Sequence, residues 1–136
     1  MARRTAETEE TFTISELASQ LEISPLAIRF YEDKGLLTPH RSPGNQRIYT
    51  KKDRGRLKRI LRGKRFGATL DEIAEMVGPV GNGIDETEQI ERSLFYIEKK
   101  FRELQEQKKE ILIFEDDLAA LKKKLAGRLK ELRKNQ

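Results

Sequence analysis

Basic side chains gather in one stretch of the sequence and suggest chemistry with a polyanion. Between Arg41 and Arg65, eleven lysines and arginines stand against the single acid Asp53, while the 136-residue chain has a formal net charge of only +5. The rest of the chain is therefore net negative. A run of like charge is often only a solvated helix face, but such a density of basic groups also matches the phosphate backbone of nucleic acid. This stretch is the first candidate for a binding surface.

Catalytic and metal-binding chemistry finds little support in the sequence. Cysteine is absent and His40 is the only histidine, which excludes a disulfide scaffold, a thiolate metal site and a cysteine nucleophile. We find no phosphate-binding glycine loop and no carboxylate cluster with a pocket to hold it. We therefore predict that the protein is not an enzyme and has no cofactor and no metal site. His40, between Pro39 and Arg41, is interpreted as a solvated loop residue.

Length and composition bound the architecture. The chain allows one compact domain, or a small domain plus one extended element. Charged residues make up 38% of it against 36% hydrophobic residues, so the core is modest and much of the chain is solvated. The longest aliphatic and aromatic run, residues 111–114, is too short to span a membrane, and the first ten residues lack a secretion signal. These features predict a cytoplasmic protein.

Capping patterns divide the first half of the chain into four short helices. The helix starts combine an N-cap residue with an acid three residues later or a proline at the first position: Thr13 with Glu16, Ser24 with Pro25, Thr50 with Asp53, and Thr69 with Glu72. Gly35 and Gly67 suit helix ends. The first two helices are separated by a turn of two residues, as in a helix-turn-helix unit.

The second helix has an inner and an outer face. We predict Leu26 and Phe30, with Ile28 as a further option, as its inward contacts, which leaves Arg29 and Tyr31 on the outer face.

The segment after the second helix is typical of a β-ribbon. The sequence TPHRSPGNQRIYT, residues 38–50, carries two prolines, a glycine and an asparagine before an extended alternation begins, and we interpret it as a turn and a wing. Residues 1–11 lack hydrophobic periodicity and are predicted to form a flexible arm. The domain then covers residues 12–77, a glycine-rich linker covers 78–86, and residues 87–136 form a single helix.

This last helix carries a heptad repeat. Its alternating spacing of four and three predicts a coiled coil, and because the helix is too long to bury its stripe on the small domain, a second copy is the simplest partner. The alternative is a helix partly folded back on its own domain. Charged Lys108, Glu115 and Lys122 would each face their own copies in a parallel dimer, so we predict an antiparallel homodimer. The apolar dimerisation positions are Ile90, Leu94, Ile97, Phe101, Leu104, Ile111, Leu118, Leu125, Leu129 and Leu132.

Four apolar residues lie off this seam. Leu112, Phe114 and Leu121, together with Tyr96, either line a groove for a ligand or protein or pack against the partner's domain.

Two segments carry a resemblance to a known family. The sequences FTISELASQLEISPLAIRFYEDKGLLTP, residues 12–39, and RSPGNQRIYT, residues 41–50, resemble the DNA-binding domain of the MerR family of bacterial transcription regulators. The resemblance covers residues 12 to about 77, and the long helix behind it matches the family's plan. It implies a mainly α fold with a winged helix-turn-helix domain and an antiparallel coiled-coil dimer. It also implies sequence-specific binding to an inverted repeat at a promoter, with distortion of the DNA and RNA polymerase as a further partner.

The resemblance assigns DNA-binding roles to particular positions. The second helix reads the major groove while the wing and the third helix hold phosphates. Tyr31 and Tyr49 could instead pack inward. Gln46 stands where many members carry an aromatic residue, which leaves the wing-tip contact open. The DNA-binding positions implied are Ser24, Arg29, Tyr31, Arg41, Asn45, Gln46, Arg47, Tyr49, Arg54 and Lys58.

Other functions remain open. One is an architectural DNA-binding protein with little sequence preference, and another is a DNA-anchored adaptor that recruits a protein through its coiled coil. Because family members that sense metals or oxidants use cysteines, this chain's small-molecule effector is not indicated.

Overall fold

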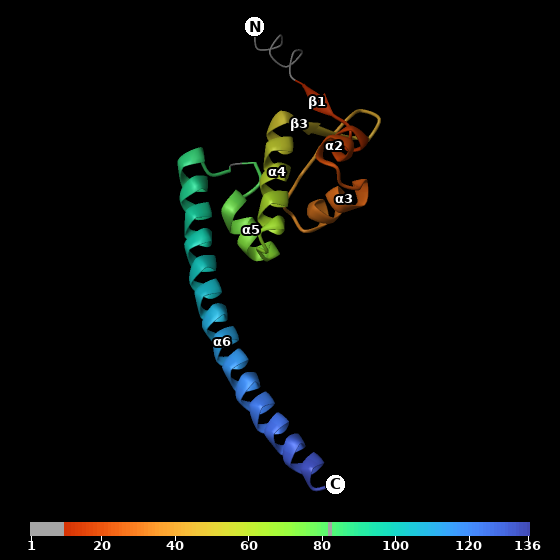
Figure 1. The fold of residues 1–136 in the computed structure, drawn as a ribbon. Coiled ribbons are helices and arrows are strands. Elements are labelled where there is room, and N and C mark those ends of the chain that lie inside the picture. The colour runs from red at the N-terminus through yellow and green to blue at the C-terminus, as the bar shows by residue number, and fades with distance from the viewer. Residues whose placement is uncertain (1–9, 82) are drawn as a thin grey trace. The chain divides into compact units, whose positions relative to one another are not determined.

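The structure is a computed structural model that describes residues 10–81 and 83–136. The chain divides into two compact units, one ending at Ser93 and the other comprising Leu94–Gln136. In its described residues the first unit contains a three-stranded sheet and four short helices, and most of the second unit is helical (Figure 1). The elements are β1 (Thr11–Phe12), α2 (Ile14–Leu21), α3 (Pro25–Asp33), β2 (His40–Arg41), β3 (Arg47–Thr50), α4 (Lys51–Arg65), α5 (Leu70–Val77) and α6 (Glu86–Lys134).

The predicted helix starts are confirmed. The side chains of Thr13, Thr50 and Thr69 each accept a hydrogen bond from the backbone N–H three residues later, and the carboxylate at that later position accepts one from the backbone N–H of the threonine. These reciprocal bonds satisfy backbone donors that a helix start leaves without partners. Gly35 has a positive φ of 77°, and the N–H of Leu36 donates to the carbonyl of Tyr31 at 2.9 Å. This pattern is a Schellman motif, and it ends α3 at the predicted place.

The small sheet is larger than the sequence indicates. β3 lies in the centre, pairs antiparallel with β2 to form the wing, and pairs antiparallel with β1 on its other edge. The lack of periodicity predicts an arm through residue 11, but Thr11 pairs with Thr50 in the sheet. Residues 1–9 of that arm lie outside the described residues.

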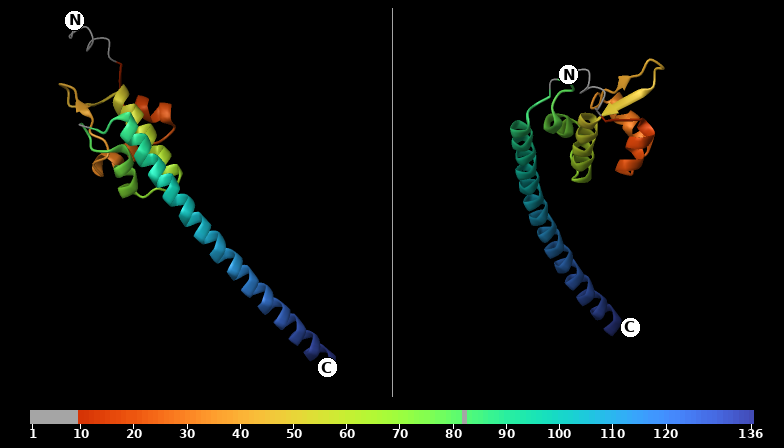
Figure 2. Two further views of the ribbon diagram at one scale, coloured as in Figure 1. Left: turned by 90° about the vertical axis from the view of Figure 1, so that its left-hand side faces the viewer. Right: turned by 90° about the horizontal axis from the view of Figure 1, so that it is seen from above.

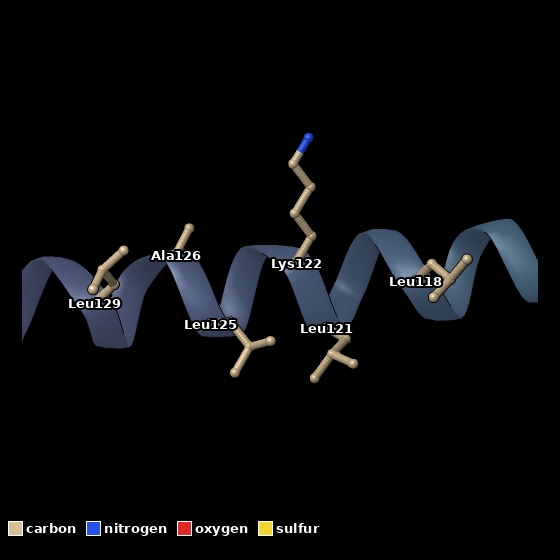
Figure 3. A pocket seen from close by; sticks show the side chains of 6 residues that line it. All are labelled: Leu118, Leu121, Lys122, Leu125, Ala126 and Leu129. Atoms are coloured by element: carbon tan, nitrogen blue, oxygen red, sulfur yellow. The ribbon is translucent and has the colours of Figure 1, made fainter.

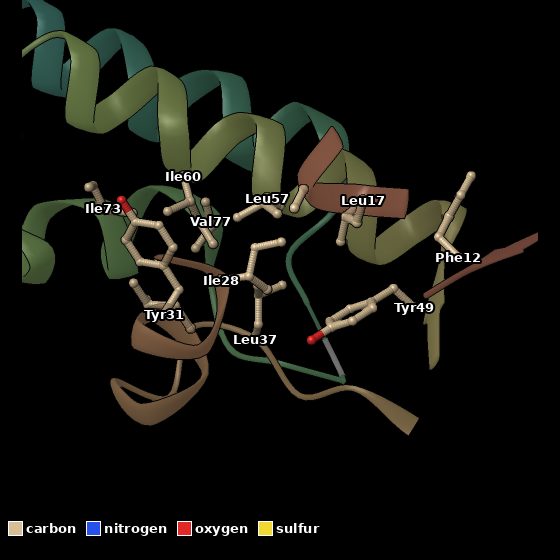
Figure 4. Packing of buried hydrophobic residues seen from close by; sticks show 12 residues of the cluster. Phe12, Leu17, Ile28, Tyr31, Leu37, Tyr49, Leu57, Ile60, Ile73 and Val77 are labelled. Carbon is tan, nitrogen blue, oxygen red and sulfur yellow. The ribbon is translucent and has the colours of Figure 1, made fainter. Parts of the chain in front are cut away.

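The core of the first unit lies between the helices and the sheet. In Figures 1 and 2, α4 lies between α5 on one side and the α2–α3 pair on the other. Gly63 lets α4 and α5 approach closely, since a Cβ there would lie 2.9 Å from Cγ1 of Ile73. Figure 4 shows how the core side chains converge. The buried cluster consists of Phe12, Leu17, Ala18, Ile28, Tyr31, Leu36, Leu37, Tyr49, Leu57, Ile60, Ile73 and Val77.

The long helix α6 has no interruption. It is continuous over 49 residues, about 74 Å at 1.5 Å per residue, and it bends gently (Figure 2). All ten apolar positions of the predicted seam are exposed in the single chain. Figure 3 shows part of this surface, where Leu118, Leu121, Leu125 and Leu129 surround a shallow apolar hollow and the Lys122 side chain extends away from Leu121 and Leu125. No other described residue buries this stripe.

Candidate nucleic-acid interface

The faces of α3 differ from those predicted at three positions, whereas Arg29 lies on the outer face and Ile28 on the inner face as expected. Ile28 and Tyr31 are buried, with Tyr31 only 3% exposed, and Figure 4 shows both directed towards the core residues of α4. Leu26 is 72% exposed and Phe30 is 44% exposed. The prediction of Leu26 and Phe30 as inward contacts is therefore wrong. The face that solvent reaches consists of Leu26, Arg29, Phe30 and Asp33.

Burial also decides between the two interpretations of the tyrosines. Tyr31 packs in the core, and its burial raises the pKa of its hydroxyl. Tyr49 has no exposed surface and lies beside Leu17 and Phe12 in Figure 4. Side chains so deeply enclosed cannot reach a base or a phosphate. The prediction of direct DNA contacts for Tyr31 and Tyr49 is corrected, because both support the elements that carry other contacts.

The start of α3 is accessible. Ser24 is exposed, and its Oγ accepts a hydrogen bond from the N–H of Ala27 at 3.1 Å, so the hydroxyl caps the helix. Arg29 lies one turn further along and forms no hydrogen bond or ion pair with another described residue. Its guanidinium is therefore available for an outside acceptor. A guanine edge and a phosphate are both suited to bidentate arginine contacts.

The wing is a tight hairpin whose tip is exposed. The N–H of Asn45 donates to the carbonyl of Ser42 at 2.8 Å, and Asn45 has a positive φ of 62°. The N–H of Gln46 donates to Oγ of Ser42 at 3.1 Å. Asparagine tolerates this left-handed conformation better than most residues. The turn holds Asn45 and Gln46 at the tip of the ribbon, with both side chains exposed.

Glu32 connects the wing to α3, a role the sequence interpretation missed. Nε of Arg47 donates to both carboxylate oxygens of Glu32, at 2.9 and 3.2 Å, and the Tyr49 hydroxyl donates to Oε1 of the same carboxylate. Burial, then this hydrogen bond and the charge of Glu32, raise the pKa of Tyr49. The carboxylate thus fixes β3 against the helix that precedes the wing. Its position next to Tyr31, on the inward side of α3, is the signal that could have revealed it.

Arg41 and Arg47 lie directly opposite each other in the wing ribbon. Like charges at such a cross-strand pair repel each other. Glu32 offsets the charge of Arg47, whose side chain is only 27% exposed. Arg41 remains exposed, and one of its guanidinium N–H groups donates to the carbonyl of Asn45 at 3.2 Å. The predicted phosphate contacts of the wing therefore separate into an anchored arginine and an accessible one.

Helix α4 presents most of its basic residues outward. Lys51, Lys52, Lys58, Arg62, Lys64 and Arg65 are exposed. Arg54 is half-buried, with its guanidinium carbon 5.6 Å from the centre of the Phe12 ring. Of the two α4 positions predicted to hold phosphates, Lys58 is fully accessible, while Arg54 also packs on β1.

Arg56 turns inward, unlike the exposed basic residues of α4. It is 9% exposed, and its guanidinium donates to the carbonyl of Leu36 at 2.6 Å, to that of Gly78 at 2.7 Å and to that of Val77 at 3.2 Å. Burial and the nearby Arg59 lower the pKa of Arg56. The carbonyls at the end of α5 have no hydrogen-bond donors within the helix, and the Arg56 guanidinium provides these donors. This residue is structural and connects α4 to the start of the linker.

The described residues contain neither a metal-binding cluster nor a membrane-spanning helix. Between Glu10 and Gly81 and from Gly83 onward, no three histidine, cysteine or acidic side chains converge where they could hold a metal ion. No helix in this part of the chain is both long and apolar enough to cross a membrane.

Comparison with known proteins places the chain in a family. Residues 12–78 match the family described as MerR HTH family regulatory protein, and residues 54–127 match that described as MerR, DNA binding. The HTH-type transcriptional regulator CueR of Salmonella typhi is 33% identical over 104 residues, which cover 73% of this chain and 75% of that protein. The mercuric resistance operon regulatory protein of Shigella flexneri is 31% identical over 113 residues, which cover 82% and 75%.

Solved structures agree with the sequence relatives. HiNmlR, a MerR family regulator lacking the sensor domain and bound to promoter DNA, superposes with a TM-score of 0.52 at 27% identity, over 79% of this chain and 80% of that chain. A MerR family transcriptional regulator from Bacillus cereus gives a TM-score of 0.55 at 29% identity, over 79% of each chain. The mainly helical fold with a small wing and a long C-terminal helix is shared. The chain belongs to the MerR family of helix-turn-helix transcriptional regulators.

Proposed function

We propose that the protein regulates transcription by binding an inverted repeat at a promoter as a homodimer, and that it distorts the DNA it binds. The observation that carries this proposal is that one unit exposes both the basic residues of α4 and the side of α3 that holds Arg29. α3 enters the major groove, and the wing and α4 contact the phosphates on either side. The promoter complex of HiNmlR supports the assignment by similarity.

The charges of the wing agree with this assignment. Arg41 lies opposite Arg47, and Glu32 pairs with Arg47 alone. A phosphate beside Arg41 would relieve the remaining repulsion within the ribbon and add a charge-assisted hydrogen bond. Lys58 supplies a second phosphate contact from α4. Both residues contribute affinity without sequence preference, whereas Arg29 contributes discrimination between bases.

Dimerisation is proposed on the exposed seam of α6. Ten apolar side chains along one helix need a partner surface, and a second copy supplies an identical one. The antiparallel arrangement follows from Lys108, Glu115 and Lys122, because it brings Lys108 close to Glu115 of the partner subunit. A symmetric dimer then presents two DNA-binding units to two half-sites of a repeat.

Orientation of the two helices can be measured with a spin label. The chain has no cysteine, so Lys99→Cys gives a single attachment site. Pairing of Lys108 with Glu115 puts the dyad between these residues, which places the two labels roughly 37 Å apart along the helices at 1.5 Å per residue. Labels separated by the width of a helix pair would indicate parallel helices. Light scattering that gives a monomer at micromolar concentration would contradict the dimer itself.

The DNA target can be found without a prior guess. Purified protein is incubated with fragments of its source genome at about 0.15 M salt, which weakens non-specific phosphate binding, and the retained fragments are sequenced. We expect one or a few inverted repeats located at promoters. Diffuse retention without a shared motif would favour an architectural role. A partner pull-down that survives nuclease treatment would favour the adaptor, and RNA polymerase is the partner we expect only when promoter DNA is present.

Two variants distinguish contacts to the phosphates from recognition of the bases. Lys58→Ala should weaken binding to all sequences similarly and reduce the slope of log affinity against log salt by about one. Arg29→Ala should lower the preference for the selected site over random DNA. If Arg29→Ala left both the affinity and this preference unchanged, α3 would not be the reading helix.

A further inference from the structure

Two apolar side chains on α3 are exposed and lie outside the buried core. Leu26 is 72% exposed and lies at the second position of the helix, directly after Pro25. Phe30 is 44% exposed one turn later. Residues four apart lie on the same side of a helix, so the two form one apolar strip beside Arg29. The core of this unit is complete without them, since Ile28 and Tyr31 fill it from the same helix.

Contacts around Phe30 hold its ring in place. The edge of the ring meets Tyr31, with 5.5 Å between centroids at an interplanar angle of 72°, and Nζ of Lys34 lies 5.5 Å from its centre. Lys34 covers one face and brings a positive charge to the same surface. Phenylalanine has no hydroxyl to donate to a phosphate, so its accessible part offers apolar contact only.

Surrounding charge argues for DNA as the occupant of this strip. Arg29 lies between the two apolar residues in sequence, Lys34 covers Phe30, and α4 contributes its exposed basic residues to the same unit. Apolar residues within a basic surface suit a polyanion that carries apolar groups of its own. In the major groove, the only such group on an unmodified base is the C5-methyl of thymine. The first residues of a recognition helix are those that reach base edges.

We propose that Leu26 and Phe30 recognise thymine methyl groups in each half-site, on either side of the base contacted by Arg29. This inference rests on the proposed function and adds the base preference. Leu26 and Phe30 are about 6 Å apart along the helix axis at 1.5 Å per residue. Successive base pairs are about 3.4 Å apart along each strand. The two thymines are therefore expected about two base pairs apart.

The test removes single methyl groups from the DNA. In the site recovered by genomic selection, each thymine is replaced in turn by deoxyuridine, which pairs identically but lacks the methyl group. Affinities are measured for the full-length wild type and for the Leu26→Ala and Phe30→Ala variants. Phe66→Ala is the matched control, since Phe66 is an exposed phenylalanine with an arginine near its ring but lies at the end of α4.

Each methyl group that is buried in the complex should be worth about a fourfold change in affinity. We expect at least one thymine per half-site whose replacement weakens wild-type binding by this factor. The same replacement should leave the affinity of Leu26→Ala unchanged and should weaken the binding of Phe66→Ala as much as that of the wild type. At a second thymine, the replacement should weaken binding of the wild type but have no effect on binding of Phe30→Ala. Circular dichroism of the variants separates misfolding from a lost contact.

Other outcomes would overturn the inference. Methyl-sensitive positions that keep their full effect in both α3 variants would assign the methyl contacts to other residues. A selected site without methyl-sensitive positions would leave the strip for a different partner, such as a protein. Both results would leave the proposed function standing. Absence of any selected site would instead remove the proposed function, and the base preference with it.

Discussion

The two units of the chain differ in where their apolar residues lie. In the DNA-binding unit, leucine, isoleucine and tyrosine side chains from five elements fill a closed core, and several are completely buried. In α6, every apolar residue of the heptad seam is exposed. Burial of apolar surface is the main favourable term in folding. The first unit is therefore stabilised within one chain, whereas the seam of α6 gains this stabilisation only in the proposed dimer.

A charge placed in the heptad seam tests whether the exposed apolar residues of α6 form the dimer interface. Leu118→Glu places a charge among apolar residues at the middle of the proposed interface, where it would have to be buried without a partner. We expect a monomer at micromolar concentration and an affinity for the inverted repeat lowered by at least about 100-fold, because the two half-sites are no longer bound by one particle. Sedimentation and DNA titration measure the two effects.

The control for this variant lies on the opposite side of the same helix. Ala120 is exposed and outside the seam, so Ala120→Glu adds the same charge without entering the interface. It should remain a dimer with wild-type affinity. Dimers of equal strength in both variants would show that the heptad stripe is not the interface.

Inside the DNA-binding unit, the largest stability effect is expected at Arg56. Its guanidinium is the partner of the carbonyls of Leu36, Val77 and Gly78. Arg56→Ala leaves them buried without a donor, which should cost about 2–4 kcal/mol. Urea unfolding of the variant measures this loss. Lys58→Ala, which removes an exposed charge two residues away, should stay within about 0.5 kcal/mol of wild type. Equal effects would mean that Arg56 acts only through net charge.

Tyr49 gives a pH-dependent effect of intermediate size. Its pKa is raised above the ordinary value of 10 in the folded protein, so the neutral hydroxyl bonded to Glu32 stabilises the fold. That stabilisation is fully present below pH 10 and is lost as the pH rises above it. Tyr49→Phe should therefore cost about 1–2 kcal/mol at pH 7. This difference from wild type should shrink by roughly 1 kcal/mol between pH 9 and pH 11.

Comparing the unfolding free energies of the two proteins at each pH cancels the titration of the lysines, which both share. A difference that stays constant across this range would show that the Tyr49 hydroxyl does not titrate differently in the folded state.

Helix limits and the apolar stripe of α6 were predictable from the sequence because their signals are local. Three capping boxes use residues three apart, and Gly35 supplies the left-handed conformation that ends α3. The seam repeats over many turns, so its period averages over single exceptions. These signals do not depend on which other element lies nearby.

The faces of α3 were not predicted because a nine-residue helix carries two competing stripes. Leu26 with Phe30 and Ile28 with Tyr31 both fit helical spacing, and only the tertiary structure selects between them. One local signal was available. In a Schellman motif the residues at C3 and C″ tend to be in contact, and here these are Tyr31 and Leu36, both buried. That pairing indicates the inward face, and Glu32 follows on the same side.

Arg56 shows a different limit of sequence interpretation. Arg56 stands four residues before Ile60 on the buried side of α4, but the sequence does not show what it binds, because its partners are backbone carbonyls about twenty positions away in the chain. The sheet edge formed by β1 was missed for another reason. A two-residue strand has too few positions to show an alternation.

The smallest expected effect concerns the turn between α2 and α3. Glu22 has φ of 57° and ψ of 42°, a left-handed conformation that glycine adopts without steric cost. Glu22→Gly should therefore stabilise the DNA-binding unit by about 0.5–1 kcal/mol in urea unfolding, since the relief of strain exceeds the added chain entropy. Glu22→Ala keeps a Cβ and removes the same charge, so an equal gain from alanine would assign the effect to charge. Because Glu22 belongs to the unit that is stabilised within one chain, the dimer dissociation constant of Glu22→Gly should match that of wild type, whereas Leu118→Glu changes that constant above all.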